Sequence, residues 1–482
     1  MGEHLDVVII GAGLSGVGAA CNLTRAFPKR SYALLESRDD LGGTWSLFRY
    51  PGVRSDSDMY TLGYRFKPWI GDKALADAPA ILDYVREAAR ENGVEPHIRY
   101  RHRVRAARWS SEEQRWTLEV DHDGTLVELT CDFLWSCAGY YDYERPHAPE
   151  FPGIEEYAGT VVHPQLWPDD LDYAGKRVVV IGSGATAVTL VPAMAQTAAH
   201  VTMLQRTPTY VVSIPAHDPI ARRLQRWLPE KLAYRITRRK NVSFQLNLYR
   251  LSQRFPDAAR RLIRTFAVRS LPDGYEVDTH FSPPYKPWDQ RMCLVPDGDL
   301  FRAISDGTAS VVTDTIETFT EKGIRLRSGE ELEADLVVTA TGLNLKVMAG
   351  LDFQVDGTEV KLPETMAYKA MMLSGVPNFA FTIGYTNAAW TLKADLVSDY
   401  VCRLLAHMDE HGLRTVVVPQ PDADVEPMPF LQDFTPGYVL RSLAELPRQG
   451  SREPWKLRQS YHYDRRRIQK GAIDDGVLEF QS

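Results

Sequence analysis

The stretch LDVVIIGAGLSG, residues 5–16, decides the fold of this chain. Its apolar first half is typical of a buried strand, small residues from 17 to 23 predict a helix, and residues 31–35 predict a second strand. Three glycines occupy the turn between the first strand and the helix: Gly11, Gly13 and Gly16. They allow a pyrophosphate to approach the backbone at the N-terminus of the helix, so the stretch predicts a dinucleotide-binding βαβ unit.

The carboxylate of Glu36 strengthens this prediction. Glu36 follows Gly16 by twenty residues, at the end of the second predicted strand, where it could accept hydrogen bonds from both ribose hydroxyls of a dinucleotide. The competing interpretation is a glycine turn in an ordinary α/β protein, which the order of strand, turn, helix and acid disfavours.

A second βαβ unit begins near Arg177, with predicted strands at 178–181 and 201–204 and a helix ending near residue 195. Its turn contributes four candidate cofactor residues: Gly182, Gly184, Thr186 and Ala187, with Ala187 in place of the third glycine. The second strand is followed by Arg206 rather than by an acid. A guanidinium here favours the 2′-phosphate of NADP over NAD, although a plain surface arginine is the alternative.

Two such units predict an α/β fold with two Rossmann-like dinucleotide-binding domains and a helical insertion in the second. We assign residues 1–150 and 341–482 to an FAD-binding domain and residues 151–340 to an NADP-binding domain. Residues 99–107, 115–120 and 126–129 are expected to form a small antiparallel layer. Two further strands, 133–137 and 335–339, are expected to return to the parallel sheets.

Composition excludes several classes of protein. The net charge of −7 gives no general attraction for nucleic acid, and the five cysteines show neither CxxC pairs nor a spacing with histidine that would bind metal. No apolar run approaches the length of a membrane span, and the first predicted strand leaves no room for a signal peptide. We therefore expect a cytoplasmic enzyme without metal.

The insertion, at about 215–287, is unusually basic. Residues 222–269 hold fourteen Lys or Arg against two acids, so the rest of the chain sums to −19. The favoured interpretation is a helical face that pairs with acidic surface elsewhere in the protein. The alternative combines these charges with the aromatic and aliphatic residues between them and predicts contact with a membrane surface or an acidic partner through residues 222–269.

The run from Gly42 to Asp56, between the two units, carries a resemblance. It matches the pattern Gly-Gly-x-Trp-x4-Tyr-Pro-Gly-x3-Asp at every fixed position and so resembles class B flavoprotein monooxygenases, specifically Baeyer-Villiger monooxygenases. A second family signature, Phe-x-Gly-x3-His-x3-Trp, is present at residues 157–167 with Tyr157 in place of Phe. Its last residue, Trp167, is typically Tyr or Phe in the related S- and N-oxidising enzymes.

Further stretches, 47–52 with 55–60, 287–291 and 434–440, are similar to the ethionamide-activating members of this family. The resemblance implies an NADPH- and O2-dependent FAD enzyme that converts small hydrophobic ketones to esters or lactones through a C4a-peroxyflavin and also oxidises sulfur-containing substrates. It implies that Arg291 is the cation beside the flavin, with Asp56 orienting it, whereas an arginine at this position could otherwise be a salt-bridged surface residue.

The resemblance also implies roles for the start of the run. Gly43 and Thr44 would approach the flavin, and Trp45 would form a wall beside it, although Trp45 could instead be a core aromatic. Trp390 could border the same pocket or pack in the core, while His163 and Trp167 are expected to be structural. Two other functions stay open: an S- or N-oxygenating flavin monooxygenase without ketone activity, and a weakly catalytic flavoprotein that docks through its basic helices.

Overall fold

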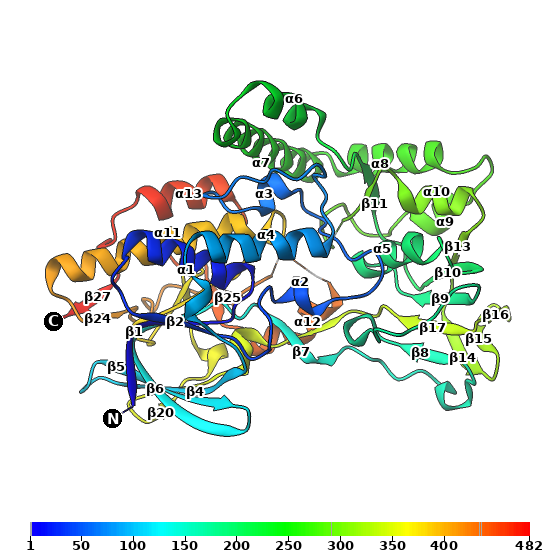
Figure 1. Cartoon of the computed structure of the whole chain (residues 1–482). Helices are drawn as coiled ribbons and strands as arrows, with labels where there is room; N and C mark the ends of the chain where they lie inside the picture. Colours follow the sequence, from blue (N-terminus) through cyan, green and yellow to red (C-terminus); the bar gives the residue numbers. More distant parts are fainter. Residues whose placement is uncertain (1, 291, 433, 435) are drawn as a thin grey trace.

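The computed structural model describes residues 2–290, 292–432, 434 and 436–482. Two sheets lie side by side, and a group of helices lies across the top of the view in Figure 1. The helices of the chain are α1 (Leu14–Ala26), α2 (Thr44–Leu47), α3 (Met59–Leu62), α4 (Ala78–Glu91), α5 (Ala185–Met194), α6 (Pro219–Trp227), α7 (Glu230–Arg254), α8 (Pro256–Ser270), α9 (Val277–Phe281), α10 (Asp299–Ser305), α11 (Trp390–His411), α12 (Gly437–Ser442) and α13 (Tyr461–Lys470).

The first sheet has nine strands in the order β20-β19-β4-β5-β6-β1-β2-β3, and β23 also pairs with β6. Their bounds are β1 (Glu3–Ile10), β2 (Tyr32–Leu35), β3 (Ile98–Arg99), β4 (His102–Ser110), β5 (Arg115–His122), β6 (Thr125–Ser136), β19 (Asp352–Val355), β20 (Thr358–Glu359) and β23 (Phe379–Phe381). Strand β1 is parallel to both neighbours, as a Rossmann-like unit requires. Its residues from Val7 to Ile10 are buried on both faces.

The predicted antiparallel strands are present, since β4 pairs antiparallel with β5 and β5 with β6, but they belong to the same sheet as the parallel strands. Residues 126–129 and 133–136 belong to one strand, β6, which pairs antiparallel with β5 through its first half and parallel with β1 through its second half. The meander therefore continues the parallel sheet. The predicted strand 99–107 is likewise two strands, β3 and β4, because Arg101 between them adopts a left-handed φ of 57°.

The second sheet is parallel throughout, in the order β13-β10-β9-β17-β8. Its strands are β8 (Thr160–Val162), β9 (Arg177–Ile181), β10 (His200–Gln205), β13 (Ala309–Thr313) and β17 (Leu336–Thr339). Helix α5 connects β9 to β10, so the second predicted βαβ unit is present. Helices α6 to α9 follow β10 in the chain, where the sequence predicted a helical insertion.

The other strands form short pairs and one three-stranded sheet. They are β7 (Tyr141–Pro146), β11 (Val211–Ile214), β12 (Cys293–Pro296), β14 (Ile316–Thr320), β15 (Gly323–Leu326), β16 (Glu331–Glu333), β18 (Leu343–Leu345), β21 (Ala367–Tyr368), β22 (Met372–Leu373), β24 (Thr415–Val417), β25 (Pro427–Pro429), β26 (Arg448–Gly450) and β27 (Glu479–Gln481). Within the described residues, no helix has the length and apolar character needed to cross a membrane.

The run from Gly42 to Asp56 joins the cores of the two sheets. Trp45 packs against the core that lies under α1 and α11, whereas Phe48 and Tyr50 pack with the core around α5. At Gly52 the run passes so close to α5 that a side chain would not fit, because a Cβ added there would lie 2.6 Å from the Cβ of Ala193. Its φ of 76° also favours glycine. The run is therefore a structural link between the two βαβ units.

Candidate functional site

The two glycine turns of the first unit lie against each other. The amide of Gly42 donates to the carbonyl of Ala12 at 2.9 Å, and Gly13 and Gly42 form an isolated bridge. Gly16 is required by packing, since an added Cβ would stand 1.8 Å from the carbonyl oxygen of Gly11. Strand β1, the start of α1 and the 42–43 turn therefore meet where the sequence predicted a pyrophosphate.

Glu36 is buried at the end of β2 and holds the turns in place. One carboxylate oxygen accepts from the amide of Ala12 at 2.9 Å, and the other accepts from the amide of Arg38 at 3.0 Å. The Arg38 guanidinium then donates to the carbonyl of Gly43 and to the side chain and carbonyl of Ser46. Arg38 was not predicted as a site residue, although its position two residues after Glu36 was visible in the sequence.

A cavity of about 580 Å³ opens beside these turns. Its wall contains Gly11, Gly13, Glu36 and Arg38 at one end, and Thr186 and Thr189 of α5 at another. The run from Gly42 to Ser57 supplies much of the surface between them. The cavity therefore connects the first βαβ unit with the helix of the second, and its volume lies within the range of ligand-binding pockets.

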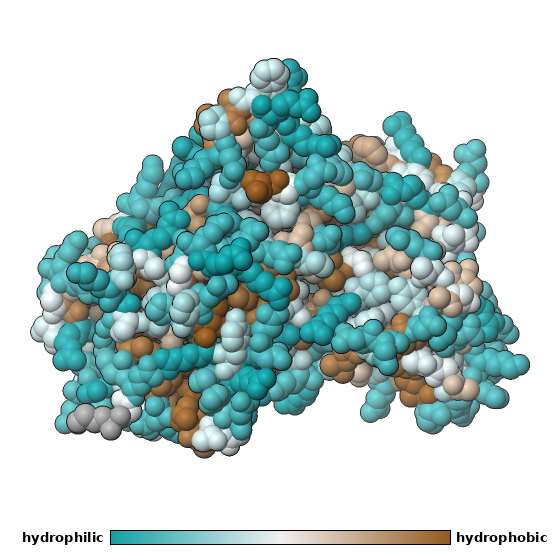
Figure 2. Space-filling model, viewed as in Figure 1, coloured by the Kyte–Doolittle hydropathy of each residue, from teal (hydrophilic) through white to brown (hydrophobic). Residues whose placement is uncertain are grey.

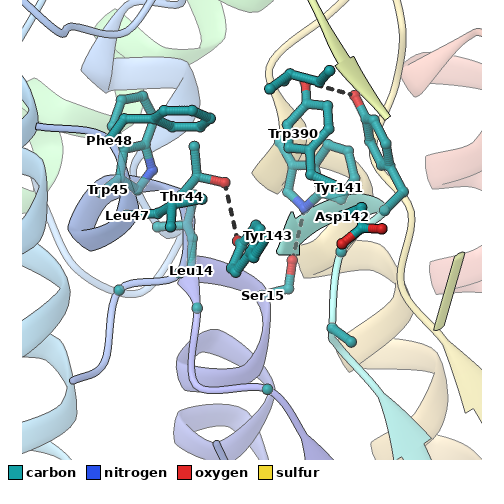
Figure 3. A pocket seen from close by; sticks show the side chains of 18 of the residues that line it. Leu14, Ser15, Thr44, Trp45, Leu47, Phe48, Tyr141, Asp142, Tyr143 and Trp390 are labelled. Atoms are coloured by element: carbon teal, nitrogen blue, oxygen red, sulfur yellow. Dashed lines mark hydrogen bonds between the residues drawn. The ribbon is translucent and has the colours of Figure 1, made fainter. Parts of the chain in front are cut away.

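Figure 3 shows two groups of side chains that face each other across this cavity. Thr44, Trp45, Leu47 and Phe48 lie on one side, and Tyr141 and Trp390 lie on the other. Trp390 also donates from its indole nitrogen to the Ser15 hydroxyl at 2.7 Å. Trp45 and Trp390 thus border the cavity while each is partly buried against the neighbouring core, and the position of Trp45 beside a flavin stays a prediction.

Tyr143 closes the cavity near Thr44. Its hydroxyl lies 3.4 Å from the Thr44 hydroxyl, and the Arg38 guanidinium lies over its ring. Burial raises the pKa of Tyr143 to about 12, so the phenol stays neutral at physiological pH and can donate a hydrogen bond. No sequence pattern singled out Tyr143, because strand β7 reaches this place only through the three-dimensional fold.

Asp56 lies in the wall of the cavity, two residues after Arg54. Arg54 is paired with Asp299 at the start of α10, at 2.6 Å and with both side chains largely buried. This pair fixes the loop before Asp56 to the second unit. The predicted catalytic residue Arg291 lies outside the described residues.

Tyr50 provides a further link between the run and the second unit. Burial raises its pKa to about 12; the neighbouring Thr186 side chain opposes the increase, and Asp56 adds to it. The Tyr50 phenol is therefore neutral beside the Asp56 carboxylate. In the sequence, Tyr50 was recognised only as one fixed position of a family signature.

The four residues of the second glycine turn lie in different surroundings, and only Thr186 belongs to the cavity wall. Thr186 lines the cavity, whereas Ala187, in the first turn of α5, is fully buried. The backbone of Gly182 passes close to Ala340, but a Cβ added at Gly184 would find no atom within 4 Å. Arg206 is exposed just beyond the end of β10 and does not belong to the wall of this cavity.

Tyr385 reaches the cavity from the segment before α11. Its hydroxyl donates to Asp464 of α13 at 2.7 Å, and the same carboxylate is paired with the buried Lys393 at 2.9 Å. Burial raises the pKa of Tyr385 well above that of a free tyrosine, and Asp464 adds to the increase. The C-terminal helix thereby fixes a side chain of the cavity, which sequence reasoning had missed.

His163 and Trp167 lie outside the wall of this cavity, and their expected structural role stays a prediction. The His163 ring nitrogen Nδ1 accepts from the amide of Gln165 at 3.1 Å, and Trp167 packs against the core around α5. Among the described residues, no group of three or more His, Cys, Asp or Glu could hold a metal ion.

Comparison with known proteins identifies related families. Residues 75–347 match the family described as "Flavin-binding monooxygenase-like", and residues 9–67 match "NAD(P)-binding Rossmann-like domain". The chain is 59% identical to "FAD-containing monooxygenase EthA" of Mycobacterium tuberculosis (strain ATCC 25618 / H37Rv) over 481 residues, which cover 100% of the chain and 98% of that protein.

Two solved structures have a similar fold. The structure titled "Oxidized steroid monooxygenase bound to NADP" has a TM-score of 0.77 at 23% identity and covers 99% of this chain and 100% of its own. The structure titled "Crystal Structure of OTEMO complex with FAD and NADP (form 2)" has a TM-score of 0.75 at 20% identity, with 100% of both chains covered. At these identities the likeness concerns the fold alone.

These comparisons confirm several predictions. The resemblance to flavoprotein monooxygenases, the two-unit Rossmann-like fold, and FAD and NADP as cofactors are confirmed. The reaction, the substrate, the domain boundaries and the roles of individual residues stay predictions.

Proposed function

Because the chain belongs to the flavin-binding monooxygenase-like family, we propose that it is an NADPH- and O2-dependent monooxygenase that converts ketones to esters or lactones and also oxidises sulfur in thioethers or thioamides. One observation carries the proposal: the cavity whose wall is shared by both βαβ units and includes Asp56. A cavity of this kind suits two cofactors that must meet at one substrate.

The first unit has the features needed to hold FAD. The glycine turns present backbone at the cavity, Glu36 ends β2 beside it, and Thr44 and Trp45 line its middle. We propose that Gly11, Gly13 and Gly16 accommodate the pyrophosphate, Glu36 the ribose, and Gly43, Thr44 and Trp45 the flavin end, within a domain of residues 1–150 and 341–482. When bound, FAD would carry two electrons from NADPH to O2, so that one oxygen atom of O2 is transferred to the substrate and the other leaves as water.

The second unit is proposed to hold NADP within residues 151–340. The space around Gly184 would admit a phosphate at the N-terminus of α5, next to Gly182 and Thr186, and Ala187 keeps the helix close to the sheet. The guanidinium of Arg206 is exposed just beyond the end of β10. The last residue of that strand is Gln205 rather than Asp or Glu, so no carboxylate at this position would repel a 2′-phosphate.

The catalytic proposal concerns Arg291 and Asp56. A fixed guanidinium stabilises negative charge that develops on oxygen without giving up a proton, and a carboxylate beside it sets its orientation. We assign the first task to Arg291, from its position in the family motif, and the second to Asp56. The neighbouring Arg54 is less suited to the first task because Asp299 already neutralises it.

The cavity wall supports a small hydrophobic substrate. Leu47, Phe48, Val53 and Trp390 give it an apolar and aromatic surface, while the Tyr143 and Tyr385 hydroxyls add a few polar groups. Such a surface binds a ketone or thioether by burying the apolar carbon atoms of the substrate, and it keeps water away from the reacting oxygen.

Product analysis by mass spectrometry tests the proposal. The purified holoenzyme is supplied with NADPH, O2 and a panel of linear, cyclic and aryl ketones plus one thioether. Esters or lactones from ketones, together with sulfoxide, support the proposal. Sulfoxide alone would favour an S-oxygenating monooxygenase, and NADPH consumption that no substrate stimulates would favour a weakly catalytic flavoprotein.

A further inference from the structure

Exposed apolar side chains gather on one part of the molecule. Sixteen large hydrophobic side chains are exposed in the described part of the chain, and eleven of them belong to residues 220–268. They include Trp227, exposed by 76%, and Phe244, exposed by 66%. Figure 2 shows brown side chains among teal ones at the top of the view, over α6 and α7. The exposed surface of a protein seldom concentrates apolar side chains in this way unless a partner binds there.

The same helices carry most of the basic residues that the sequence singled out. In the described structure, only Arg222 and Arg238 of the fourteen pair with an acid outside residues 215–287. The favoured interpretation, a face that pairs with acidic surface elsewhere in the protein, is therefore wrong for most of them. Nine are exposed and have no ion pair to a described acid: Arg223, Arg226, Lys231, Arg235, Arg239, Arg250, Arg254, Arg261 and Arg269.

The positive surface extends beyond the insertion. His462 of α13 has its pKa lowered by burial and then by four arginines. Two of these, Arg239 and Arg250, belong to α7, and Arg465 and Arg466 belong to α13. The charges of the two helices therefore lie close enough to act on one imidazole, and they form one basic region.

Helix α7 has one exposed face with apolar and basic side chains and one face that contacts the rest of the protein. Its exposed apolar residues follow helical spacing in the order Leu232, Ile236, Phe244, Leu248 and Leu251, with the exposed arginines between them. Its opposite face is held by polar contacts. Arg238 donates to the carbonyls of Tyr60, Thr61 and Gly63, and Asn241 and Gln245 donate to the half-buried Asp58.

These contacts attach α7 firmly to the segment that follows Asp56 in the cavity wall. The exposed face therefore cannot be covered by a simple rotation of the helix, because that would break the buried contacts of Arg238. The apolar and basic side chains of α6, α7 and α8 are a fixed feature of the surface and need an external partner of matching chemistry.

We propose that the exposed face of α6, α7 and α8 binds the surface of a membrane that contains anionic lipids. Arginines among exposed Trp, Phe and Leu are typical of helices that lie in the headgroup region, with apolar side chains inserted and guanidinium groups on phosphates. A second copy of the chain packed symmetrically through the same face would bring its unpaired positive charges together, so charge favours the lipid surface.

Vesicle flotation tests the proposal on the purified holoprotein. Vesicles of phosphatidylcholine alone are compared with vesicles that also contain phosphatidylglycerol, at low and high salt. The variant Arg235→Gln/Arg239→Gln/Arg250→Gln removes three unpaired charges, and Phe244→Ser/Leu248→Ser removes two exposed apolar groups. The control, Arg101→Gln/Arg108→Gln/Arg325→Gln, changes the net charge by the same amount but removes three exposed arginines that pair with acids near β4 and β15, far from α7 in Figure 1.

Wild type and control are expected to float with the anionic vesicles, and binding should weaken with salt. Each basic residue near an anionic surface strengthens partitioning roughly fivefold, so the triple α7 variant should bind about a hundredfold more weakly. The serine variant should bind more weakly while retaining its salt dependence. NADPH consumption in solution should be unchanged, so this test is independent of the proposed reaction.

Three results would overturn the proposal. Wild type could fail to bind anionic vesicles, or the control could lose as much binding as the α7 variant. Alternatively, the wild-type protein could fail to float with any vesicle but self-associate in light scattering or bind polyglutamate, and the α7 substitutions could abolish that association or binding. That last result would assign the surface to a second copy or to an acidic protein.

Discussion

Arg238 joins α7 to the wall of the cavity, and its replacement by methionine should destabilise the protein strongly. The guanidinium donates to three carbonyls at 2.6 to 3.0 Å and to Asp395 of α11 at 2.9 Å, and both charged side chains are buried. Methionine keeps the apolar volume but leaves Asp395 without its counter-charge. Removal of one partner from a buried pair costs about 3–5 kcal/mol.

This cost can be converted into a melting temperature. An unfolding entropy of about 2.1 cal/mol/K per residue amounts to about 1 kcal/mol/K for this chain, so the midpoint should fall by about 3–5 °C if the chain unfolds cooperatively. Thermal unfolding followed by flavin fluorescence measures the change. In Arg238→Met/Asp395→Leu, most of the loss should be recovered because no buried charge is left.

The pH dependence gives an independent check. Burial raises the pKa of Asp395 to about 6, with Arg238 as the largest opposing influence. Because the folded-state pKa lies above that of the unfolded chain, the folded protein binds the proton first, and Asp395 contributes increasing stability as the pH falls through about 6 toward about 4. Without Arg238 the pKa rises further, so the defect of Arg238→Met should shrink as the pH is lowered. An unchanged midpoint at neutral pH, or a double variant as unstable as the single one, would refute the reasoning.

Three further substitutions test the cofactor and catalytic assignments. Arg291→Ala should retain FAD and permit its reduction by NADPH but lose ester formation, and near wild-type ketone conversion in product analysis would remove Arg291 from the mechanism. Arg206→Ala should raise the KM for NADPH by about tenfold, the loss of one charge-assisted contact, and leave the KM for NADH nearly unchanged; an unaltered preference would place the 2′-phosphate elsewhere. Glu36→Gln should weaken FAD binding by about tenfold, because the amide keeps one acceptor oxygen for two backbone amides and the ribose; equal FAD retention in equilibrium dialysis would show that Glu36 only supports the turn.

The local parts of the fold were predictable from the sequence. The spacing of Gly11, Gly13 and Gly16, followed by Glu36, located the first βαβ unit because each residue type answers a local demand of backbone geometry or hydrogen bonding. The second unit was found in the same way. The helical character of the insertion was also visible, since apolar residues recur there with helical spacing.

Features that depend on distant partners were not predictable. Strand β6 was divided in two because its first half alternates and its second half is continuously apolar, and only its two different neighbours explain the change. The pairing of the basic insertion was overestimated because the total charge of the chain says nothing about where acids lie. Most of its charges instead face outward.

The candidate site was partly predictable for the same reason. Family signatures located Trp45 and Asp56 in the run that lines the cavity. Tyr143 and Tyr385 reach the same cavity from strands and loops far away in sequence, and no local pattern marks them. The link between Arg54 and Asp299 spans 245 residues, so the sequence alone gives no reason to associate the two.

The transfer of oxygen from O2 to a ketone is the central claim, and isotope labelling measures it most directly. The holoenzyme is supplied with NADPH, a cyclic ketone and ¹⁸O2, and the lactone is analysed by mass spectrometry together with the NADPH consumed. We predict a lactone with one ¹⁸O atom for each NADPH oxidised. Unlabelled lactone, or NADPH oxidation that yields only hydrogen peroxide with unchanged ketone, would contradict the claim.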